Sequence, residues 1–481
     1  MSLRSWVHSF FPHSTRRNRK ARRSRIESTG TRCNYRPRGE SLESRLNLAG
    51  NVVAYVAGAN LYVTGDNLAN EVRIEGVTAG TVEVQGANLT KVNGVVGGEF
   101  TARNIQNIFM EMGNGDDKAT FVLTDVKGLL RFNGGNGHDQ LLFGEGNSGT
   151  NSFGSLAATM AAGDDVIAVD LAETSFRVPG TVVISNGEGL NNTFLGAVNT
   201  VVLGTTSVAG GGLADNVQIG TETATVTTGL LSVSSANGDN QFYLQAQTAV
   251  VNGGISLLGG TGADSNYVGV FTGDYTIKGS ITASLGNGQN LLWIGPDEVA
   301  VTGAVTYVGG TGSDTFQLEV EEFDTLAVTL ALGAGTNAVY MDNLLGATIV
   351  RSSLTITSQG DTTFNCAGLD VRGATVVTTG NGTDLLQLDN SRFRSVMTIS
   401  TGGGNDRVLL ERAFDDGIST RFDSTLSIDL GAGNDELAAG LDANDFVTFA
   451  RLIANGGSGT DTLTNSPFNV FVAPRTVLSF P

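Results

Sequence analysis

A short turn pattern, Gly-x-Gly-x-Asp or Gly-x-Gly-x-Asn, recurs along most of this 481-residue chain. Its fullest copies read GGNGHD (134–139), GGTGAD (259–264), GGTGSD (309–314) and GGSGTD (456–461). We take the last acidic or amide residue of each copy as its anchor. Fourteen steps then lead from Asp117 to Asp461, which gives a mean period of about 25 residues. A fixed period of this size is the signature of a solenoid or a propeller.

The anchors are Asp or Asn in all copies but one. They are Asp117, Asp139, Asp165, Asn191, Asp215, Asn240, Asp264, Asn290, Asp314, Asn337, Thr362, Asp384, Asp406, Asp435 and Asp461. Two copies are degenerate, because Leu213 replaces the second glycine before Asp215 and Thr362 follows only Gly360. Both are included because each fills a gap of double length.

Apolar side chains follow every anchor at a fixed offset. Positions two and four residues after the anchors are apolar, with Thr193, Asn266 and Asn465 as the exceptions. Alternation of this kind predicts a strand with one buried face. Because the alternation returns at the same offset in each copy, the strands are expected to stack coil on coil.

Each period has room for about three short strands, and no long stretch shows the 3.6-residue periodicity of a helix. The 66 glycines are also far above ordinary composition. A propeller blade needs about 40–50 residues, so the shorter period favours an all-β parallel β-helix. We therefore predict a β-solenoid of about fifteen coils with about 25 residues per coil, on the order of 70 Å long at about 4.8 Å per coil.

Composition and pattern divide the chain into four parts. Residues 1–50 are strongly basic, with a net charge of +9, and are expected to form a disordered leader. Residues 51–112 alternate well but lack the glycine turn, so they are expected to cap the first coil, whose strand edges would otherwise be open. The solenoid is expected over 113–465, and 466–481 form a C-terminal cap or tail.

The charge distribution limits the partners of the solenoid. Outside the leader the chain carries a net charge of −27, which disfavours nucleic acid through phosphate repulsion and favours cations. The basic run at 16–25 allows a second interpretation, a patch for nucleic acid or anionic lipid. No apolar run reaches 18 residues, so no transmembrane segment is predicted.

The turn pattern resembles the nonapeptide GGxGxDxUx, with U apolar, of haemolysin-type (RTX) calcium-binding proteins. Three stretches match it in full: GGNGHDQLL (134–142), GGTGSDTFQ (309–317) and GGSGTDTLT (456–464). In that family, turn carbonyls and Asp carboxylates hold Ca²⁺, a cation that prefers oxygen ligands. The resemblance implies a set of candidate calcium ligands. They are Asp117, Asp139, Asp165, Asp264, Asp314, Asp384, Asp406, Asp435 and Asp461.

The pattern also has an interpretation without metal. The family repeats its motif every nine residues, whereas here it appears once per coil and several anchors are Asn or Thr. Asp and Asn tolerate left-handed backbone and hydrogen-bond their own turns, and glycine supplies positive φ. A stacked ladder of such turns would stand without calcium, although adjacent ionised carboxylates would repel each other. The sequence leaves both the calcium site and the structural ladder open.

A row of large side chains is predicted on the outer face, three residues after successive anchors. It consists of Tyr243, Tyr267, Trp293, Gln317 and Tyr340. An exposed aromatic row can bind sugar rings or a partner surface. The alternative is that these rings stabilise the sheet by stacking on one another.

Catalytic chemistry is poorly represented in the solenoid. The parallel β-helix is the fold of pectate lyases and polygalacturonases, so a polysaccharide-binding or polysaccharide-cleaving protein is the alternative to a structural one. The solenoid, however, holds a single histidine, His138, inside a turn, and no Ser-His-Asp set or zinc motif can be assembled. The sequence therefore predicts a protein that is not an enzyme.

The segment LESRLNLAG (42–50), which follows the basic run, resembles the short LEPR-type motif near the start of large bacterial surface or secreted proteins. Ser44 stands where that motif has Pro. The resemblance implies a secreted or cell-surface location. Together with the repeat, it leads us to expect a non-enzymatic structural or adhesive β-solenoid, with calcium, extracellular polysaccharide or other envelope proteins as partners.

Overall fold

The computed structural model describes residues 50–146, 148–269, 273–342, 347–412 and 417–480. The basic run and all of the LEPR-like segment except Gly50 lie outside these ranges. Every regular element in the described ranges is a strand, and none of them contains a helix long and apolar enough to cross a membrane.

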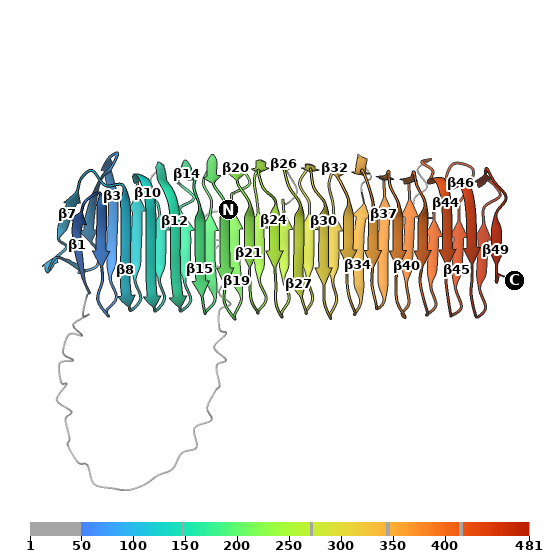
Figure 1. Ribbon diagram of the computed structural model, residues 1–481, viewed down its shortest axis with the longest axis horizontal. Helices are drawn as coiled ribbons and strands as arrows, with labels where there is room; N and C mark the ends of the chain where they lie inside the picture. The colour runs from blue at the N-terminus through green and yellow to red at the C-terminus, as the bar shows by residue number, and fades with distance from the viewer. Residues whose placement is uncertain (1–49, 147, 270–272, 343–346, 413–416, 481) are drawn as a thin grey trace, which may run out of the picture. The chain divides into compact units, whose positions relative to one another are not determined.

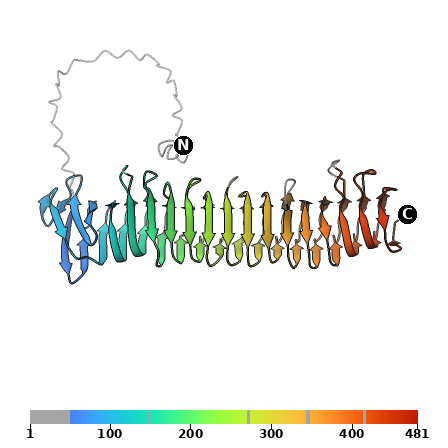
Figure 2. The ribbon, with the colours of Figure 1, turned by 90° about the horizontal axis from the view of Figure 1, so that it is seen from above.

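The described part is a parallel β-solenoid, which confirms the predicted fold class. Figures 1 and 2 show the strands running across the long axis of a continuous stack of coils. One typical coil holds β22 (Gln241–Leu244), β23 (Thr248–Val251) and β24 (Ile255–Leu258). Each of these pairs in parallel with its equivalent in the next coil, so that Gln241 lies beside Ser265 and Thr248 beside Asp274.

Fifteen strands, one per coil, follow the fifteen anchors and form what we call the anchor sheet. They are β9 (Lys118–Val122), β11 (Gln140–Phe143), β13 (Val166–Val169), β16 (Asn191–Leu195), β19 (Asp215–Ile219), β22, β25 (Ser265–Val268), β28 (Leu291–Ile294), β31 (Thr315–Leu318), β34 (Asn337–Asp342), β37 (Thr362–Ala367), β40 (Leu385–Asp389), β43 (Arg407–Leu410), β45 (Glu436–Ala439) and β47 (Thr462–Asn465).

The other two strands of each coil form two further columns. The second column contains β14 (Ser175–Val178), β17 (Thr200–Leu203), β20 (Thr225–Thr228), β23, β26 (Asp274–Ile277), β29 (Glu298–Val301), β32 (Glu322–Thr325), β35 (Ala347–Val350), β38 (Leu369–Val371), β41 (Arg392–Phe393) and β48 (Val470–Phe471). The third contains β15 (Val182–Gly187), β18 (Thr206–Gly210), β21 (Leu231–Ser234), β24, β27 (Ile281–Gly286), β30 (Val305–Gly309), β33 (Val328–Ala331), β36 (Leu354–Thr357), β39 (Thr375–Thr378), β42 (Met397–Ser400) and β49 (Thr476–Leu478). Four long strands span both columns, namely β10 (Asp125–Asn136), β12 (Thr150–Ala162), β44 (Arg421–Asp429) and β46 (Thr448–Asn455).

The N-terminal end differs from the coils because its strands turn back on themselves. These strands are β1 (Asn51–Ala57), β2 (Asn60–Thr64), β3 (Glu71–Thr78), β4 (Thr81–Gly86), β5 (Lys91–Val92), β6 (Val95–Val96), β7 (Glu99–Ala102) and β8 (Asn107–Asn114). The pairs β1–β2, β3–β4, β4–β7 and β5–β6 are antiparallel. By contrast, β3 pairs in parallel with β9, and β2 with β8, so these hairpins continue directly into the solenoid.

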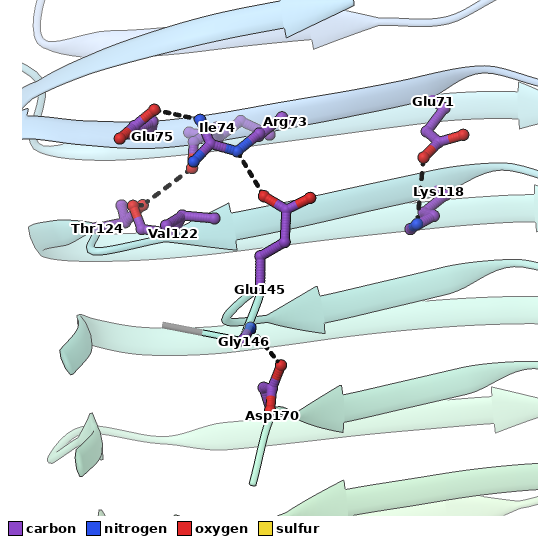
Figure 3. A network of polar contacts seen from close by, with 10 residues as sticks. All are labelled: Glu71, Arg73, Ile74, Glu75, Lys118, Val122, Thr124, Glu145, Gly146 and Asp170. Carbon is purple, nitrogen blue, oxygen red and sulfur yellow. Dashed lines mark hydrogen bonds and ion pairs between the residues drawn. The ribbon is translucent and has the colours of Figure 1, made fainter. Parts of the chain in front are cut away.

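Ion pairs on the outer surface join this end to the first coils (Figure 3). The Arg73 guanidinium on β3 contacts Glu75 on its own strand, and its Nε lies 2.8 Å from Glu145 Oε2 in the turn after β11. Lys118 Nζ on β9 lies 3.1 Å from Glu71 Oε1 on β3. Exposed ion pairs of this kind each contribute about 0–1 kcal/mol to the free energy of unfolding. We therefore infer that they help to fix the register of the first strands and add little to overall stability.

The core is built from the apolar columns that the sequence predicts. Phe316 and Leu318, two and four residues after their anchor, are buried, and the same holds in almost every coil. Near the C-terminal end Phe393, Phe422 and Phe449 stack in register, with ring centroids 5.2 and 5.6 Å apart. Thr193 interrupts its column but is fully buried, because its hydroxyl donates to Asn186 Oδ1 at 3.0 Å.

The corners of the coil differ in how much their length varies. The corner that leads from the anchor sheet into the second column contains two residues between β40 and β41 and ten between β43 and β44. The corner that carries the glycine pattern is uniform. At this corner the glycine two residues before the anchor adopts positive φ in most coils, for example +142° at Gly137 and +138° at Gly288.

These glycines also stack closely on one another. A methyl carbon placed on Gly137, Gly163 or Gly288 would lie 1.8, 1.6 or 1.7 Å from the carbonyl oxygen of the equivalent glycine one coil earlier. The pattern therefore demands glycine for two reasons, the positive φ and the absence of space between coils.

We predict that Gly288→Ala lowers the free energy of unfolding by at least about 3 kcal/mol, because it combines backbone strain with a steric overlap. Gly58→Ala is the matched control, since Gly58 also has positive φ (+63°) but no heavy atom lies within 4 Å of the added methyl. It should cost only about 1 kcal/mol. Urea unfolding of both variants measures the difference, and equal losses would contradict the role assigned to close stacking.

Candidate functional site

The nine Asp residues predicted as ligands all lie at one corner of the coil, at or immediately before the start of an anchor-sheet strand. Their side chains point into the coil rather than out of it. Each is at most 2% exposed, and Asp139, Asp314, Asp384 and Asp406 are fully buried. The sequence placed these residues in one stack, which the structure confirms, but it did not indicate that they face inward.

Within this stack, one carboxylate oxygen of each anchor accepts a backbone N–H from the anchor of the preceding coil. We call this series of bonds the inner ladder. Asp117 N donates to Asp139 Oδ1 at 2.9 Å, and Asp139 N donates to Asp165 Oδ1 at 2.7 Å. Asp384 N donates to Asp406 Oδ1 at 2.9 Å, and the series ends with Asp435 N and Asp461 Oδ1 at 3.0 Å.

The inner ladder begins one coil before the first predicted anchor. Asn70 donates to Asp117 Oδ1 through its backbone N–H at 2.7 Å and its side-chain amide at 3.1 Å. Asn70 was not predicted as an anchor, because the segment before it, Asn67-Leu68-Ala69, contains no glycine. The only available signal was its position immediately before an alternating strand.

In most of the Asp anchors the second carboxylate oxygen is buried without a hydrogen-bond partner. This applies to Oδ2 of Asp117, Asp139 and Asp165. By contrast, Asp215 Oδ2 accepts the Gly211 N–H and Asp384 Oδ2 accepts the Thr379 hydroxyl. Burial raises the pKa of Asp117 and of Asp165 to about 7, and that of Asp139 and Asp215 to about 6. These side chains therefore retain a proton at about pH 5, where an ordinary carboxyl group is largely ionised, which lowers the repulsion expected between stacked carboxylates.

The Asn anchors show how a side chain that carries hydrogen fits at the same position. Asn240 Nδ2 donates to the carbonyl of Gly238, two residues earlier, at 2.9 Å and to Asp264 Oδ1 at 2.8 Å. Asn290 Nδ2 likewise donates to Asp314 Oδ1 at 3.0 Å. A protonated Asp can donate in the same direction as this amide, so Asp and Asn are chemically equivalent members of the inner ladder.

The glycine five residues before the anchor gives the second oxygen its space. A methyl carbon on Gly309 would lie 2.0 Å from Asp314 Oδ2, and one on Gly259 would lie 2.0 Å from Asp264 Oδ2. The double glycine of the fullest copies therefore makes room for the inward carboxyl group.

The fit of this corner to calcium is poor. Calcium takes six to eight oxygen ligands at about 2.3–2.6 Å. Here one oxygen of each carboxyl group is engaged by an amide, and successive turn glycines approach too closely to admit a methyl group. In the described ranges no group of three or more His, Cys, Asp or Glu side chains is placed to hold a metal ion. Calcium binding itself stays a prediction.

A second series of bonds runs along the outside of the same corner, and we call it the outer ladder. His138 N donates to Asp116 Oδ1, Asp164 N to His138 Nδ1, and Leu190 N to Asp164 Oδ1, each at 2.9 Å. Its direction is opposite to that of the inner ladder, because each N–H here reaches back to the preceding coil. His138, the histidine of the solenoid, thus acts as a hydrogen-bond acceptor between two turns.

The outer aromatic row forms as predicted, but its rings pack against each other. Tyr243 and Tyr267 stack face to face, with centroids 4.7 Å apart and planes 3° apart. Tyr267 meets Trp293 edge to face at 5.6 Å. All three side chains are half-buried. This geometry favours sheet stabilisation over sugar binding, because a stacking sugar needs a free ring face.

Four further buried acids lie outside the repeat, namely Glu173, Asp389, Glu411 and Asp445. Burial raises the pKa of Glu173 and of Glu411 to about 7. Glu411, with φ +56°, accepts the Asn390 N–H at 3.1 Å across one coil. Neither Glu173 nor Glu411 was predicted from the sequence, because neither follows a glycine pattern.

Comparisons with protein-family models, with curated proteins and with solved structures find no match to this chain.

We predict that the solenoid is more stable at pH 4 than at pH 8. The folded-state pKa values of Asp117, Asp139, Asp165 and Asp215 are raised, so the stabilisation from their protonated forms is complete below about pH 4, the ordinary carboxyl pKa. It is lost as the pH rises through about 6 to 7. Thermal melting followed by circular dichroism at pH 4, 6 and 8 measures this slope.

Asp165→Asn is the informative variant for this prediction, and Asp164→Asn on the outer ladder is its exposed control. Asp165→Asn should raise the melting temperature at pH 8 and leave it unchanged at pH 4, because the amide keeps the acceptor oxygen and cannot ionise. A solenoid whose stability rises between pH 4 and pH 8 would refute the protonated inner ladder.

Proposed function

We propose that this chain is a non-enzymatic structural or adhesive β-solenoid that acts outside the cell or at its surface. The observation that carries the proposal is the inner ladder, which links successive coils from Asn70 to Asp461 inside a closed apolar core. At Thr362 a backbone carbonyl replaces the side-chain oxygen, because Asn337 N donates to Asp361 O at 2.8 Å. Such an interior serves only to hold the coils together. It leaves the outer strand faces as the surface available to partners.

The proposed location is based on sequence. The LEPR-like segment behind a basic leader supports export, by its resemblance to the start of bacterial surface and secreted proteins. The net charge of −27 on residues 51–481 agrees with a partner of the coils other than nucleic acid.

We further propose that the solenoid needs no calcium for its stability. Each inward carboxyl group already has an amide donor, and burial raises the pKa of Asp117, Asp139 and Asp165, which lowers the negative charge that a cation would have to neutralise. A calcium-stiffened solenoid with ligands at the same nine Asp residues is the competing proposal. A polysaccharide-cleaving role has less support, because the His138 ring accepts a backbone N–H instead of facing a cleft.

The calcium dependence of the melting temperature distinguishes the calcium-independent solenoid from the calcium-stiffened solenoid. At pH 7.5 the melting temperature should be the same in millimolar CaCl₂ as in EDTA. Asp406→Asn and Asp435→Asn should leave it unchanged or raise it, because burial raises the pKa of both carboxyl groups. A calcium-dependent rise that both substitutions abolish would establish the calcium-stiffened solenoid instead.

The proposed location predicts that the protein is accessible from outside. Protease treatment of intact cells that express the full chain should remove it, whereas a cytosolic marker should survive. Recovery of the intact protein only from the lysed cell interior would contradict the extracellular role.

A further inference from the structure

Apart from the two ladders, the outer face of the second column carries a cluster of arginine and aspartate side chains near the C-terminal end. It lies on β32, β35, β38, β41 and β44 and the residues that follow them. We call it the arginine face. Its members are Asp324, Arg351, Asp370, Arg372, Arg392, Arg394, Arg421 and Asp423.

Strand register places these side chains in two neighbouring rows along the axis of the solenoid. In one row Asp370, Arg392 and Arg421 lie side by side in successive coils. The other row, two residues further along each strand, holds Arg351, Arg372, Arg394 and Asp423. Between the two rows the strands turn Val371, Phe393 and Phe422 into the core, so the arginines stand on a rigid base.

The pairing is uneven, which leaves guanidinium groups with unused donors. Arg394 holds Asp370 through two bonds, Nε–Oδ1 at 2.6 Å and Nη2–Oδ2 at 2.7 Å. Arg372 reaches the same carboxylate only at 3.7 Å. Arg392 and Arg421 share one partner, Asp423. The Arg421 side chain is 57% exposed, and the Arg372 side chain is 48% exposed.

The charge of this face opposes that of its surroundings. The five arginines and three aspartates sum to +2, and Glu322 on the same outward face of β32 lowers the local net charge to +1, on a chain whose residues 51–481 carry −27. After Lys278 every basic residue is arginine, and four of the five on this face form close pairs that fix the direction of their guanidinium groups. Guanidinium groups bind carboxylate and sulfate through two parallel N–H bonds, which a lysine ammonium cannot do.

We propose that the arginine face binds a linear anionic polysaccharide laid along the axis of the solenoid. The exposed arginines repeat at the coil spacing of about 4.8 Å, which is of the order of one sugar unit. A carboxylate or sulfate on successive sugars would thus meet Arg372, Arg392 and Arg421 in turn. The proposal deepens the adhesive role and rests on it, since it names the class of ligand.

Arginine-specific labelling of the full chain tests the proposal at the level of single residues. The protein is treated with p-hydroxyphenylglyoxal with and without polygalacturonate, dextran sulfate or neutral dextran, and the modified peptides are quantified by mass spectrometry. Polygalacturonate or dextran sulfate should slow the labelling of Arg372 and Arg421 at least threefold, and neutral dextran should not. The two anionic polymers distinguish a carboxylate ligand from a sulfate ligand.

Arg407 is the internal control, because it is 53% exposed and paired with Glu436, but lies on the anchor sheet. Its labelling should stay unchanged. The proposal would be overturned if the polymers slowed the labelling of Arg407 as much as that of Arg372 and Arg421, or if duplex DNA slowed the labelling of the arginine face equally. Either result would show that the protection is nonspecific electrostatic binding.

Substitution provides a second measurement. The double variant Arg372→Gln with Arg421→Gln should weaken binding of the protective polymer roughly fivefold, as expected for the loss of two exposed ion pairs, whereas Arg407→Gln should not. Unchanged affinity in the double variant would overturn the proposal. Unchanged polymer affinity would leave the structural role untouched, because that role is tested separately by the melting temperature in CaCl₂ and in EDTA.

Discussion

The backbone N–H that almost every anchor donates to a side-chain oxygen of the next coil is the contact on which the rest of the solenoid depends. A coil of about 25 residues cannot bury an apolar face by itself, so every coil relies on its neighbours for a core. The inner ladder sets the position of each anchor against the next, as in the Asp384–Asp406 bond at 2.9 Å. Once the anchors are in register, the strand that follows brings its apolar residues over those of the coil below.

The same contact explains why acidic residues occupy a buried position. An ionised carboxylate is costly to bury, yet Asp139 and Asp165 are at most 1% exposed. Their raised pKa values show how the cost is met, because the neutral carboxyl group resembles the asparagine found at Asn240 and Asn290. The alternation of Asp and Asn along the corner is therefore a variation within one hydrogen-bonding role.

Much of this fold could be predicted from the sequence, because the glycine pattern marks the corner and the alternation after it marks the strand. The direction of the anchor side chain could not be predicted, since Gly-x-Gly-x-Asp is compatible with both an outward calcium ligand and an inward hydrogen-bond acceptor. Asn70 escaped notice because it lacks the glycines. The arginine face was also invisible, because pairs such as Arg394 with Asp370 lie 24 residues apart and meet only through strand register.

The contrast between the two corners has a consequence for how such a chain can change. The glycine corner leaves little space between successive turn glycines, whereas the corner between β43 and β44 contains ten residues and that between β40 and β41 only two. New sequence can therefore be inserted on one side of the solenoid without disturbing the other. The glycine corner thus keeps the coils in register, while the corner between the anchor sheet and the second column tolerates loops of different length. Loops grafted at this second corner would be displayed at regular intervals along one side of the solenoid.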